Sequence, residues 1–383
     1  MGGGFSQNDS IRTSEIKGLM RYWFRAVAGS VIGNDIKALK KLEEKVFGSQ
    51  ERKSPFRIVI GKERLSYLNK YSQEFQFSKD MNGLVYLGIG NVLFKWNKAK
   101  QKWKFNEEKI NIIAPNSTFK VKFLFKNSVD EKIIKLVAYS FYLSTALGGF
   151  GLRARRGFGS WQIVDVETEG INENLDNLKD YGLKNTNNII DEAKSTLKSF
   201  HKVDNNLNKN MKLNYTNFIN YELKQINPNK TNWKDLLNDL GAYYRYFRVN
   251  PISIDLQKDN FKRKHTKDYD EILNKRKKVK ELYNPIFGLN IIYKKYISVR
   301  LNSESETLRR ASPLFISIKE INNNLVINLF VSKSTNFKDN KHKVEVKINR
   351  NNFPVNLINE NNYQTITDFM EKLNNAMGKD NGN

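Results

Sequence analysis

The most regular pattern of apolar and polar positions lies at residues 119–125. Four apolar residues alternate there with two lysines and a leucine: Phe119, Lys120, Val121, Lys122, Phe123, Leu124 and Phe125. In a β-strand, successive side chains point to opposite faces, so this alternation gives the segment one apolar face. The pattern predicts a half-buried strand.

A helix is predicted directly after this strand. Asp130 is a good N-cap residue, and apolar residues recur between Glu131 and Leu147 at the three- and four-residue spacing of one helix face. Gly148 stands where a C′ glycine would end the helix. Residues 160–166 then alternate as a strand does. The order is therefore helix, glycine-rich loop, strand.

Other elements of the first half have weaker patterns. Residues 15–28 have an apolar stripe at helical spacing with Ser14 as the expected cap, and residues 34–46 predict a second helix. Residues 58–60 and 84–89 are predicted as strands. Residues 95–109 predict a basic loop or a hairpin.

The first half thus consists of helix, strands, helix and strand, which is a mixed α+β pattern. One more strand at the start would complete the ferredoxin-like order βαββαβ. The sequence offers no strand before the first helix, because residues 2–4 are glycines. We therefore expect a ferredoxin-like domain that lacks its usual N-terminal strand.

The second half predicts more helix. Residues 188–203, 232–247 and 368–377 have helical periodicity, and Thr365 is the expected cap of the last helix. Three apolar runs predict strands: residues 287–292, 314–318 and 325–331. A chain of 383 residues is long enough for two cores. We expect two domains, residues 1–169 and residues 170–383.

The glycine-rich loop, Gly148–Ser160, carries the candidate chemistry. It holds five glycines and three arginines: Gly148, Gly149, Gly151, Gly157, Gly159, Arg153, Arg155 and Arg156. Glycine permits positive φ and close backbone approach, and the guanidinium fork of arginine suits phosphate. The loop predicts a mobile cationic segment for a polyanion, and the alternative is a glycine-rich turn with solvated arginines. Phe150 and Phe158 either stack on bases or pack in the core.

Two phosphate-binding motifs are excluded. Gly149, Gly151 and Ala154 match G-x-G-x-x-A, but a dinucleotide fingerprint requires strand, loop and helix in that order, and here a helix precedes the loop. The sequence also lacks a G-x-x-x-x-G-K-[ST] segment. The loop therefore predicts neither a Rossmann site nor a P-loop.

Charge narrows the class of partner. The formal net charge is +25, which favours attraction to a polyanion. The basic residues are spread along the chain rather than gathered on one amphipathic helix, which favours nucleic acid over an anionic membrane. The chain lacks cysteine, and its three histidines lie far apart, so we expect no metal site and no cofactor. We expect a cytoplasmic nucleic-acid binder without a membrane segment.

Further basic groups are candidates for the same role. Lys17, Arg21 and Arg25 follow one another at four-residue spacing along the first predicted helix, and they form either an RNA-facing stripe or a solvated face. Arg309 and Arg310 are a weaker third set. The basic run at residues 258–280 either contacts RNA or forms a solvated helix face.

The sequence resembles a known family. The loop Gly148–Ser160 is similar to the glycine-rich loop of the RAMP superfamily, the RNA-binding proteins of CRISPR systems. Further ordered blocks resemble subunit one of the type III-B (Cmr) effector complex: Ser14–Ala26, Leu42-Glu43, Phe47–Ser49, Ser54-Pro55, Asn284–Leu289 and Arg309–Leu314. The family's usual first strand and Thr-Pro turn are absent here.

The resemblance implies two ferredoxin-like RAMP domains, the second enriched in helix. It also implies a non-catalytic subunit that sits at the guide's 3′ end and helps capture target RNA in antiviral defence. Its expected partners are CRISPR guide RNA, single-stranded target RNA and other RAMP subunits. The alternative is a metal-independent endoribonuclease that processes CRISPR repeat RNA. Such an enzyme needs a general base, and the first predicted domain has no histidine, leaving Tyr22 or Lys17 for that role.

Overall fold

A computed structural model describes most of the chain. The described residues are 11–68, 82–88, 94–97, 99–100, 102–105, 112–171, 173–201, 207, 210–251, 266–275, 278–289, 291–294, 297–301, 311–334, 344–349, 351–357 and 363–378. Residues 1–10, Arg309, Arg310, and residues 258–265 and 276–277 of the basic run lie outside these ranges.

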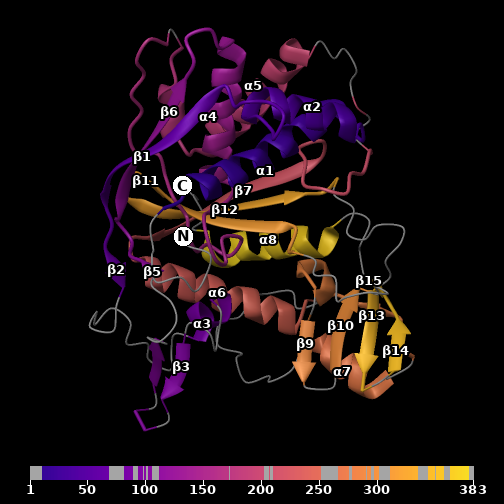
Figure 1. Cartoon of the computed structure of the whole chain (residues 1–383). Helices are drawn as coiled ribbons and strands as arrows, with labels where there is room; N and C mark the ends of the chain where they lie inside the picture. The colour runs from indigo at the N-terminus through magenta and orange to yellow at the C-terminus, as the bar shows by residue number, and fades with distance from the viewer. Residues whose placement is uncertain are drawn as a thin grey trace, which may run out of the picture.

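Four helices form a layer at one end of the molecule (Figure 1). They are α1 (Thr13–Ile32), α2 (Ile36–Phe47), α4 (Glu131–Ala146) and α5 (Leu183–His201). The antiparallel strands β1 (Phe56–Arg64) and β6 (Thr118–Phe125) pack against this layer. Because α5 comes from the second half of the sequence, the layer joins residues from both predicted domains.

A three-stranded antiparallel sheet lies beneath the helical layer. Its order is β11 (Leu314–Ile321), β12 (Asn324–Ser332) and β7 (Tyr221–Lys230). Alternate residues point to opposite faces. Phe315 and Phe330 pack with Trp23 of α1, whereas Ile316 and Leu329 face a second core on the other side of the sheet.

That second core is covered by α6 (Trp233–Val249) and α8 (Gln364–Met377). The sheet is therefore buried on both faces, which explains why β12 is buried at seven of its nine positions rather than at alternate ones. The second half of the chain follows the order β7, α6, β11, β12, α8, and both helices cover the same face of the sheet.

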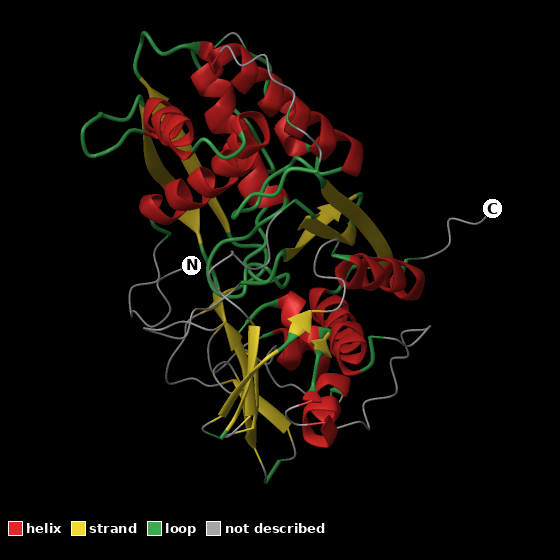
Figure 2. Cartoon of the chain, turned by 90° about the vertical axis from the view of Figure 1, so that its right-hand side faces the viewer, coloured by secondary structure: helices red, strands yellow, loops and turns green. Residues whose placement is uncertain are grey.

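Smaller elements complete the other end of the molecule, opposite the helical layer (Figure 2). A four-stranded antiparallel sheet has the order β14 (Asn351–Pro354), β13 (Val344–Ile348), β10 (Ile297–Leu301) and β9 (Ile291–Lys294). Near it lie α7 (Lys267–Lys275), the 3-10 turn η5 (Asn284–Phe287), β8 (Glu281–Leu282) and β15 (Asn356–Leu357). The remaining short elements are α3 (Asn82–Leu87), β2 (Tyr67–Leu68), β3 (Phe94–Asn97), β4 (Lys102–Phe105), β5 (Ile112–Ile113) and η3 (Asp176–Lys179).

The mixed α+β class is confirmed, with several antiparallel sheets. The strand at 118–125, the hairpin β3–β4, and the helices α1, α2, α4, α5, α6 and α8 lie where the pattern predicts them. Asp130 accepts a hydrogen bond from Lys132 N, as a cap does. Two predicted caps are wrong: Ser14 and Thr365 lie inside α1 and α8, whose N-caps are Arg12 and Tyr363.

Three other predictions are wrong. Residues 82–87 form helix α3 rather than a strand, because they pack lengthwise against α6. Residues 160–166 form no strand ladder. The predicted strand at 287–292 divides into the turn η5, which ends at Phe287, and strand β9, which begins at Ile291.

No helix among the described residues is long and apolar enough to cross a bilayer.

Candidate nucleic-acid interface

The glycine-rich loop closes on itself at its base. Phe150 N donates a hydrogen bond to Gly159 O at 2.9 Å. Gly159 has φ +63°, and a Cβ there would lie 2.0 Å from Phe150 O. Only glycine combines this conformation with this approach. Gly151 and Gly157 also have positive φ, as the glycine content predicts.

Gly148 and Gly149 have another role. Gly148 follows the cap residue Leu147, at the C′ position that the sequence predicts, but neither glycine has positive φ. A Cβ at Gly148 would lie 2.9 Å from Trp23 Nε1, and one at Gly149 would lie 2.9 Å from Gly159 O. Both glycines permit close packing at the end of α4.

The loop is anchored along the edge strand β11. Gly157 N donates to Ile316 O, and Ile316 N donates to Arg155 O, at 2.9 and 3.2 Å. Beyond them, Ile318 N donates to Ser160 Oγ at 3.0 Å. Gln162 exchanges two side-chain hydrogen bonds with the backbone of Glu320. Side chains thus replace the expected backbone ladder after residue 160, and the base of the loop is fixed rather than mobile.

Arg155 belongs to this anchor. Its guanidinium donates to Ser312 O and to the Tyr22 hydroxyl, and it lies 4.2 Å from the centroid of the Phe315 ring. These contacts join the loop to α1 and to the residues before β11. Part of the hydrogen-bonding capacity of the Arg155 guanidinium is therefore satisfied within the protein.

Arg153 and Arg156 have different surroundings. Both are half-buried, and neither forms an ion pair or a side-chain hydrogen bond with any described residue. Burial lowers the pKa of the Arg153 guanidinium, and the nearby charge of Arg156 lowers it further. Two adjacent cations without a carboxylate favour an external anion, because burial leaves their charge poorly solvated.

The ring of Tyr244 brings a third arginine to the loop. Arg156 lies 5.4 Å from its centroid, and Arg248 lies 5.9 Å from it. Arg248 also donates to Asn284 Oδ1 at 3.1 Å and to the Tyr86 hydroxyl at 3.2 Å. The sequence places Arg248 only at the end of a predicted helix. Its approach to the loop depends on tertiary packing, which no local pattern reveals.

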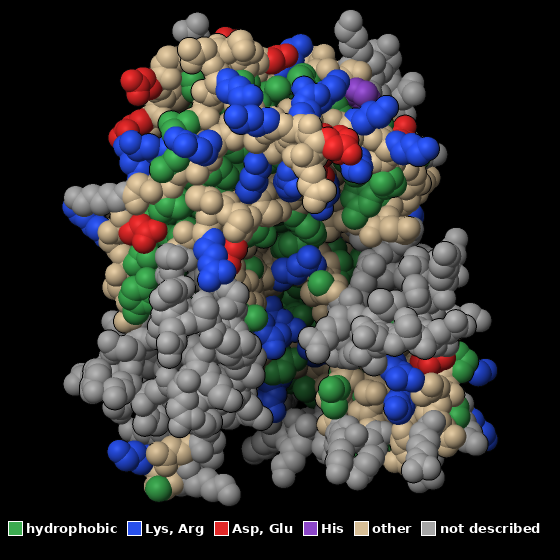
Figure 3. Space-filling model, viewed as in Figure 1, with side chains coloured by type: hydrophobic (Ala, Val, Ile, Leu, Met, Phe, Trp, Pro, Cys, Tyr) green, Lys and Arg blue, Asp and Glu red, His purple; other side chains and the backbone are tan. Residues whose placement is uncertain are grey.

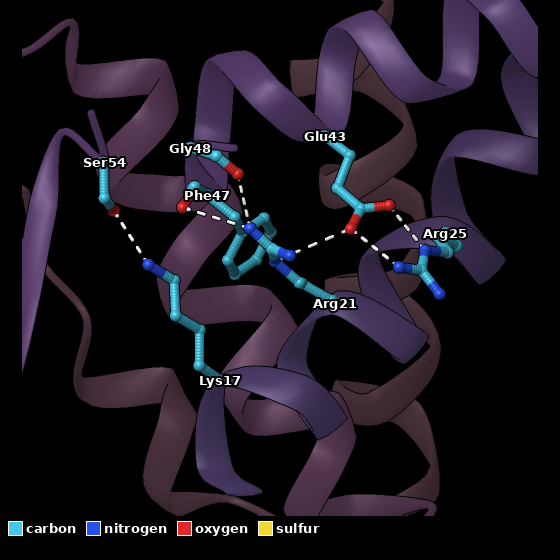
Figure 4. Close-up of polar contacts among 7 residues, drawn as sticks. All are labelled: Lys17, Arg21, Arg25, Glu43, Phe47, Gly48 and Ser54. Atoms are coloured by element: carbon cyan, nitrogen blue, oxygen red, sulfur yellow. Dashed lines mark hydrogen bonds and ion pairs between the residues drawn. The ribbon is translucent and has the colours of Figure 1, made fainter. Parts of the chain in front are cut away.

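The predicted stripe on α1 is largely engaged within the protein (Figure 4). Lys17 Nζ donates to Ser54 Oγ at 3.0 Å, and burial together with the charge of Arg21 lowers the pKa of Lys17. Arg21 donates to the Gly48 carbonyl and lies 3.6 Å from the Glu43 carboxylate. Arg25 binds both oxygens of Glu43, which raises the pKa of Arg25. The stripe faces α2 and the segment that follows it.

We predict that Glu43→Gln lowers the free energy of unfolding by about 1 kcal/mol, because one carboxylate pairs with two partly exposed arginines. Urea denaturation measures this change. Glu44→Gln is the matched control, since the Glu44 carboxylate forms an ion pair with Lys40 alone among the described residues, at 3.9 Å, and we expect a change within about 0.5 kcal/mol. Equal decreases in the free energy of unfolding of the two variants would contradict a stabilising role for the pairing of Glu43 with the two arginines.

The two loop phenylalanines belong to the protein interior. Phe150 is 2% exposed, and Phe158 packs against the core beneath the sheet. Of the two alternatives, core packing therefore holds for both.

Within the described residues, no group of three potential metal-binding side chains occurs. Figure 3 shows Lys and Arg side chains gathered in a hollow that runs down the centre of one face, below the helical layer.

Comparisons with known proteins identify relatives. The RAMP superfamily model matches residues 1–162. The CRISPR system Cmr subunit Cmr1-1 of Pyrococcus furiosus is 30% identical over 319 residues, covering 81% of this chain and 77% of that protein. Cmr subunit Cmr1-2 of the same organism is 34% identical over 166 residues, covering 43% of this chain and 88% of that protein.

A solved structure has a similar fold. The crystal structure of Cmr1 from Pyrococcus furiosus in its apo form matches with a TM-score of 0.51 and 22% sequence identity. The match covers 86% of this chain and 82% of that chain. The similarity extends over both halves of the sequence.

Proposed function

Because the chain belongs to the RAMP superfamily, and within it to the Cmr1 subunits of type III-B CRISPR Cmr complexes, we propose that it is a non-catalytic RNA-binding subunit of such a complex. In this proposal it lies at the 3′ end of the guide and helps capture target RNA. Its partners are guide RNA, single-stranded target RNA and other RAMP subunits.

The observation that carries the proposal is the pair Arg153 and Arg156. They are half-buried, lie beside each other and have no carboxylate partner among the described residues. Phosphate contacts position a nucleic acid without reading its sequence. A subunit whose specificity comes from guide pairing needs contacts of this kind.

The predicted stripe is a secondary part of the proposed interface. For Arg21 and Arg25 to bind phosphate, they must exchange Glu43 for RNA, whereas Arg153 and Arg156 pair with no carboxylate in the part of the chain that the structure describes. We therefore assign phosphate binding first to Arg153 and Arg156. Arg155 positions the loop, and Lys17, Arg21 and Arg25 form a second wall. Arg309 and Arg310, outside the described residues, remain proposed contacts.

The topology also supports two ferredoxin-like halves. In the second half, β7, α6, β11, β12 and α8 follow the order βαββα, and β12 lies between β11 and β7 as that fold requires. In the first half, the described elements α1, β1, β6 and α4 follow the order αββα, which is part of the same arrangement. We propose the boundary near residue 169 on this basis.

The test is single-stranded RNA binding as a function of salt. For Arg153→Gln/Arg156→Gln we expect weaker binding and a log K against log[salt] slope that is flatter by about 1.4, since each phosphate contact contributes roughly 0.7. Lys37→Gln/Lys41→Gln on the exposed face of α2 removes the same charge and should leave the slope unchanged. An unchanged slope in the loop variant would overturn the proposal.

An RNA cleavage assay with the wild-type protein tests the enzymatic alternative. Lys17 and Tyr22, the candidate bases, are hydrogen-bonded to Ser54 and to Thr216. We expect labelled CRISPR repeat RNA to remain intact during incubation with the protein in EDTA. Discrete cleavage products would contradict a non-catalytic role.

A further inference from the structure

The tip of the arginine loop presents one apolar side chain to solvent. Leu152 is 51% exposed, whereas Phe150 and Phe158 of the same loop pack inward. The loop therefore does not expose apolar groups indiscriminately. Its fold packs two phenylalanines inward and leaves one leucine in contact with solvent.

The backbone at the tip keeps Leu152 outside. Gly151 has φ +90° and Arg153 has φ +62°, so residues with positive φ flank Leu152 on both sides. For arginine this conformation costs about 1 kcal/mol, because the β-carbon crowds the backbone. The hydrogen bonds from Phe150 to Gly159 and from Gly157 to Ile316 hold the base of the loop. The tip is thus preorganised.

The surroundings of Leu152 indicate what it contacts. Its chain neighbour Arg153, together with Arg156, forms the pair without a carboxylate partner. A partner of matching chemistry has negative charge for the arginines and a flat apolar surface within a few ångströms of that charge. Single-stranded RNA has both, because each phosphate is followed by a base with two apolar faces. Leucine is one of the side chains that proteins insert between base steps.

We infer that Leu152 is a base-contacting wedge, which packs against an unstacked base while Arg153 and Arg156 hold the adjacent phosphates. The inference rests on the proposed function, since it requires RNA at this loop. It adds a contact that depends on bases rather than on charge. A phosphate-only interface would bind a backbone without bases equally well.

The experiment compares two probes of equal length and charge: a single-stranded oligoribonucleotide and the same backbone with abasic sites. We expect the wild type to bind the RNA about tenfold more tightly than the abasic probe, which partial burial of one leucine can supply. Leu152→Ala should lose this preference and keep its salt slope, because leucine carries no charge. A 2-aminopurine base in the RNA should brighten with the wild type and not with Leu152→Ala.

Val164→Ala is the matched control. Val164 is 75% exposed but lies beyond the anchored loop, so this variant should keep the RNA preference. Both side chains are exposed, so neither substitution should alter the melting temperature.

The outcomes separate the two proposals. If Arg153→Gln/Arg156→Gln leaves the salt slope unchanged, the proposed function fails and the wedge fails with it. If that slope flattens but Leu152→Ala keeps the full preference for RNA over the abasic probe, only the wedge is overturned. Loss of binding to another Cmr subunit in Leu152→Ala, with RNA binding intact, would also overturn it and assign the leucine to a protein contact.

Discussion

Gly241→Ala is expected to destabilise the protein by about 3 kcal/mol or more, because the added methyl group would occupy space held by another helix. A Cβ at Gly241 would lie 2.0 Å from Gly83 O, and one at Gly83 would lie 1.9 Å from Asn238 O. These atoms belong to the backbone and cannot rotate away. The helices α3 and α6 must therefore separate.

Separation removes more than one contact. Asn238 Oδ1 accepts hydrogen bonds from Gly83 N and Leu84 N, so it satisfies the first turn of α3. Leu84 and Leu87 are buried in the core shared with α6. Undocking α3 exposes both leucines and leaves those amides to water. Urea denaturation measures the loss of stability, and native-state hydrogen exchange should show faster exchange in α3.

Gly18→Ala is the control for this prediction. Gly18 lies in the exposed face of α1, and a Cβ there would meet nothing within 4 Å. Alanine in a helix interior is favoured over glycine, so we expect a gain of up to about 1 kcal/mol. If Gly241→Ala is as stable as Gly18→Ala, α3 does not pack against α6 in solution.

The same helix shows why local pattern fails at some elements. Leu84, Val85 and Tyr86 give an apolar run that predicts a strand, and a run of six residues carries too little periodicity to distinguish the two structures. What decides the structure is the approach of Gly83 to Gly241, which lies 158 residues away. By contrast, β6 and α4 are predictable because their alternation and the Asp130 cap are local.

The candidate site also has some features that the sequence identifies and others that only the fold reveals. The sequence identifies the glycine loop, because five glycines and three arginines in thirteen residues are a local feature. It does not distinguish Arg155, which anchors the loop, from Arg153 and Arg156, which have no carboxylate partner among the described residues. It also misses that Glu43 neutralises the stripe on α1, since Glu43 lies on another helix. Partner identity requires the fold.

The other large effect concerns Lys319, a buried lysine of β11. Its side chain is 1% exposed, and Nζ donates to Trp161 O at 2.8 Å. Nζ also lies 5.4 Å from the centroid of the Tyr181 ring. Burial lowers the pKa of Lys319 to about 7. Burial also raises the pKa of Tyr181, so that phenol stays neutral in the range where the lysine titrates.

The sign of the pH dependence follows. In the unfolded chain the pKa of lysine is about 10.4, so between about pH 7 and pH 10 the unfolded state binds the proton and the folded state does not. Stability therefore rises with pH across this window. The full cost of burying the charge, on the order of 4 kcal/mol, applies below pH 7.

Lys319→Met removes this titration, although it leaves Trp161 O without its donor. We expect the difference in unfolding free energy, wild type minus Lys319→Met, to increase by roughly 1 kcal/mol per pH unit from pH 7.5 to pH 9.5. Urea denaturation at several pH values, followed by tryptophan fluorescence, measures the difference, and groups common to both proteins cancel. A difference in unfolding free energy that does not change with pH for Lys319→Met would contradict this prediction. It would show that the Lys319 amine is hydrated in the folded protein and remains charged near Trp161 O without a loss of stability.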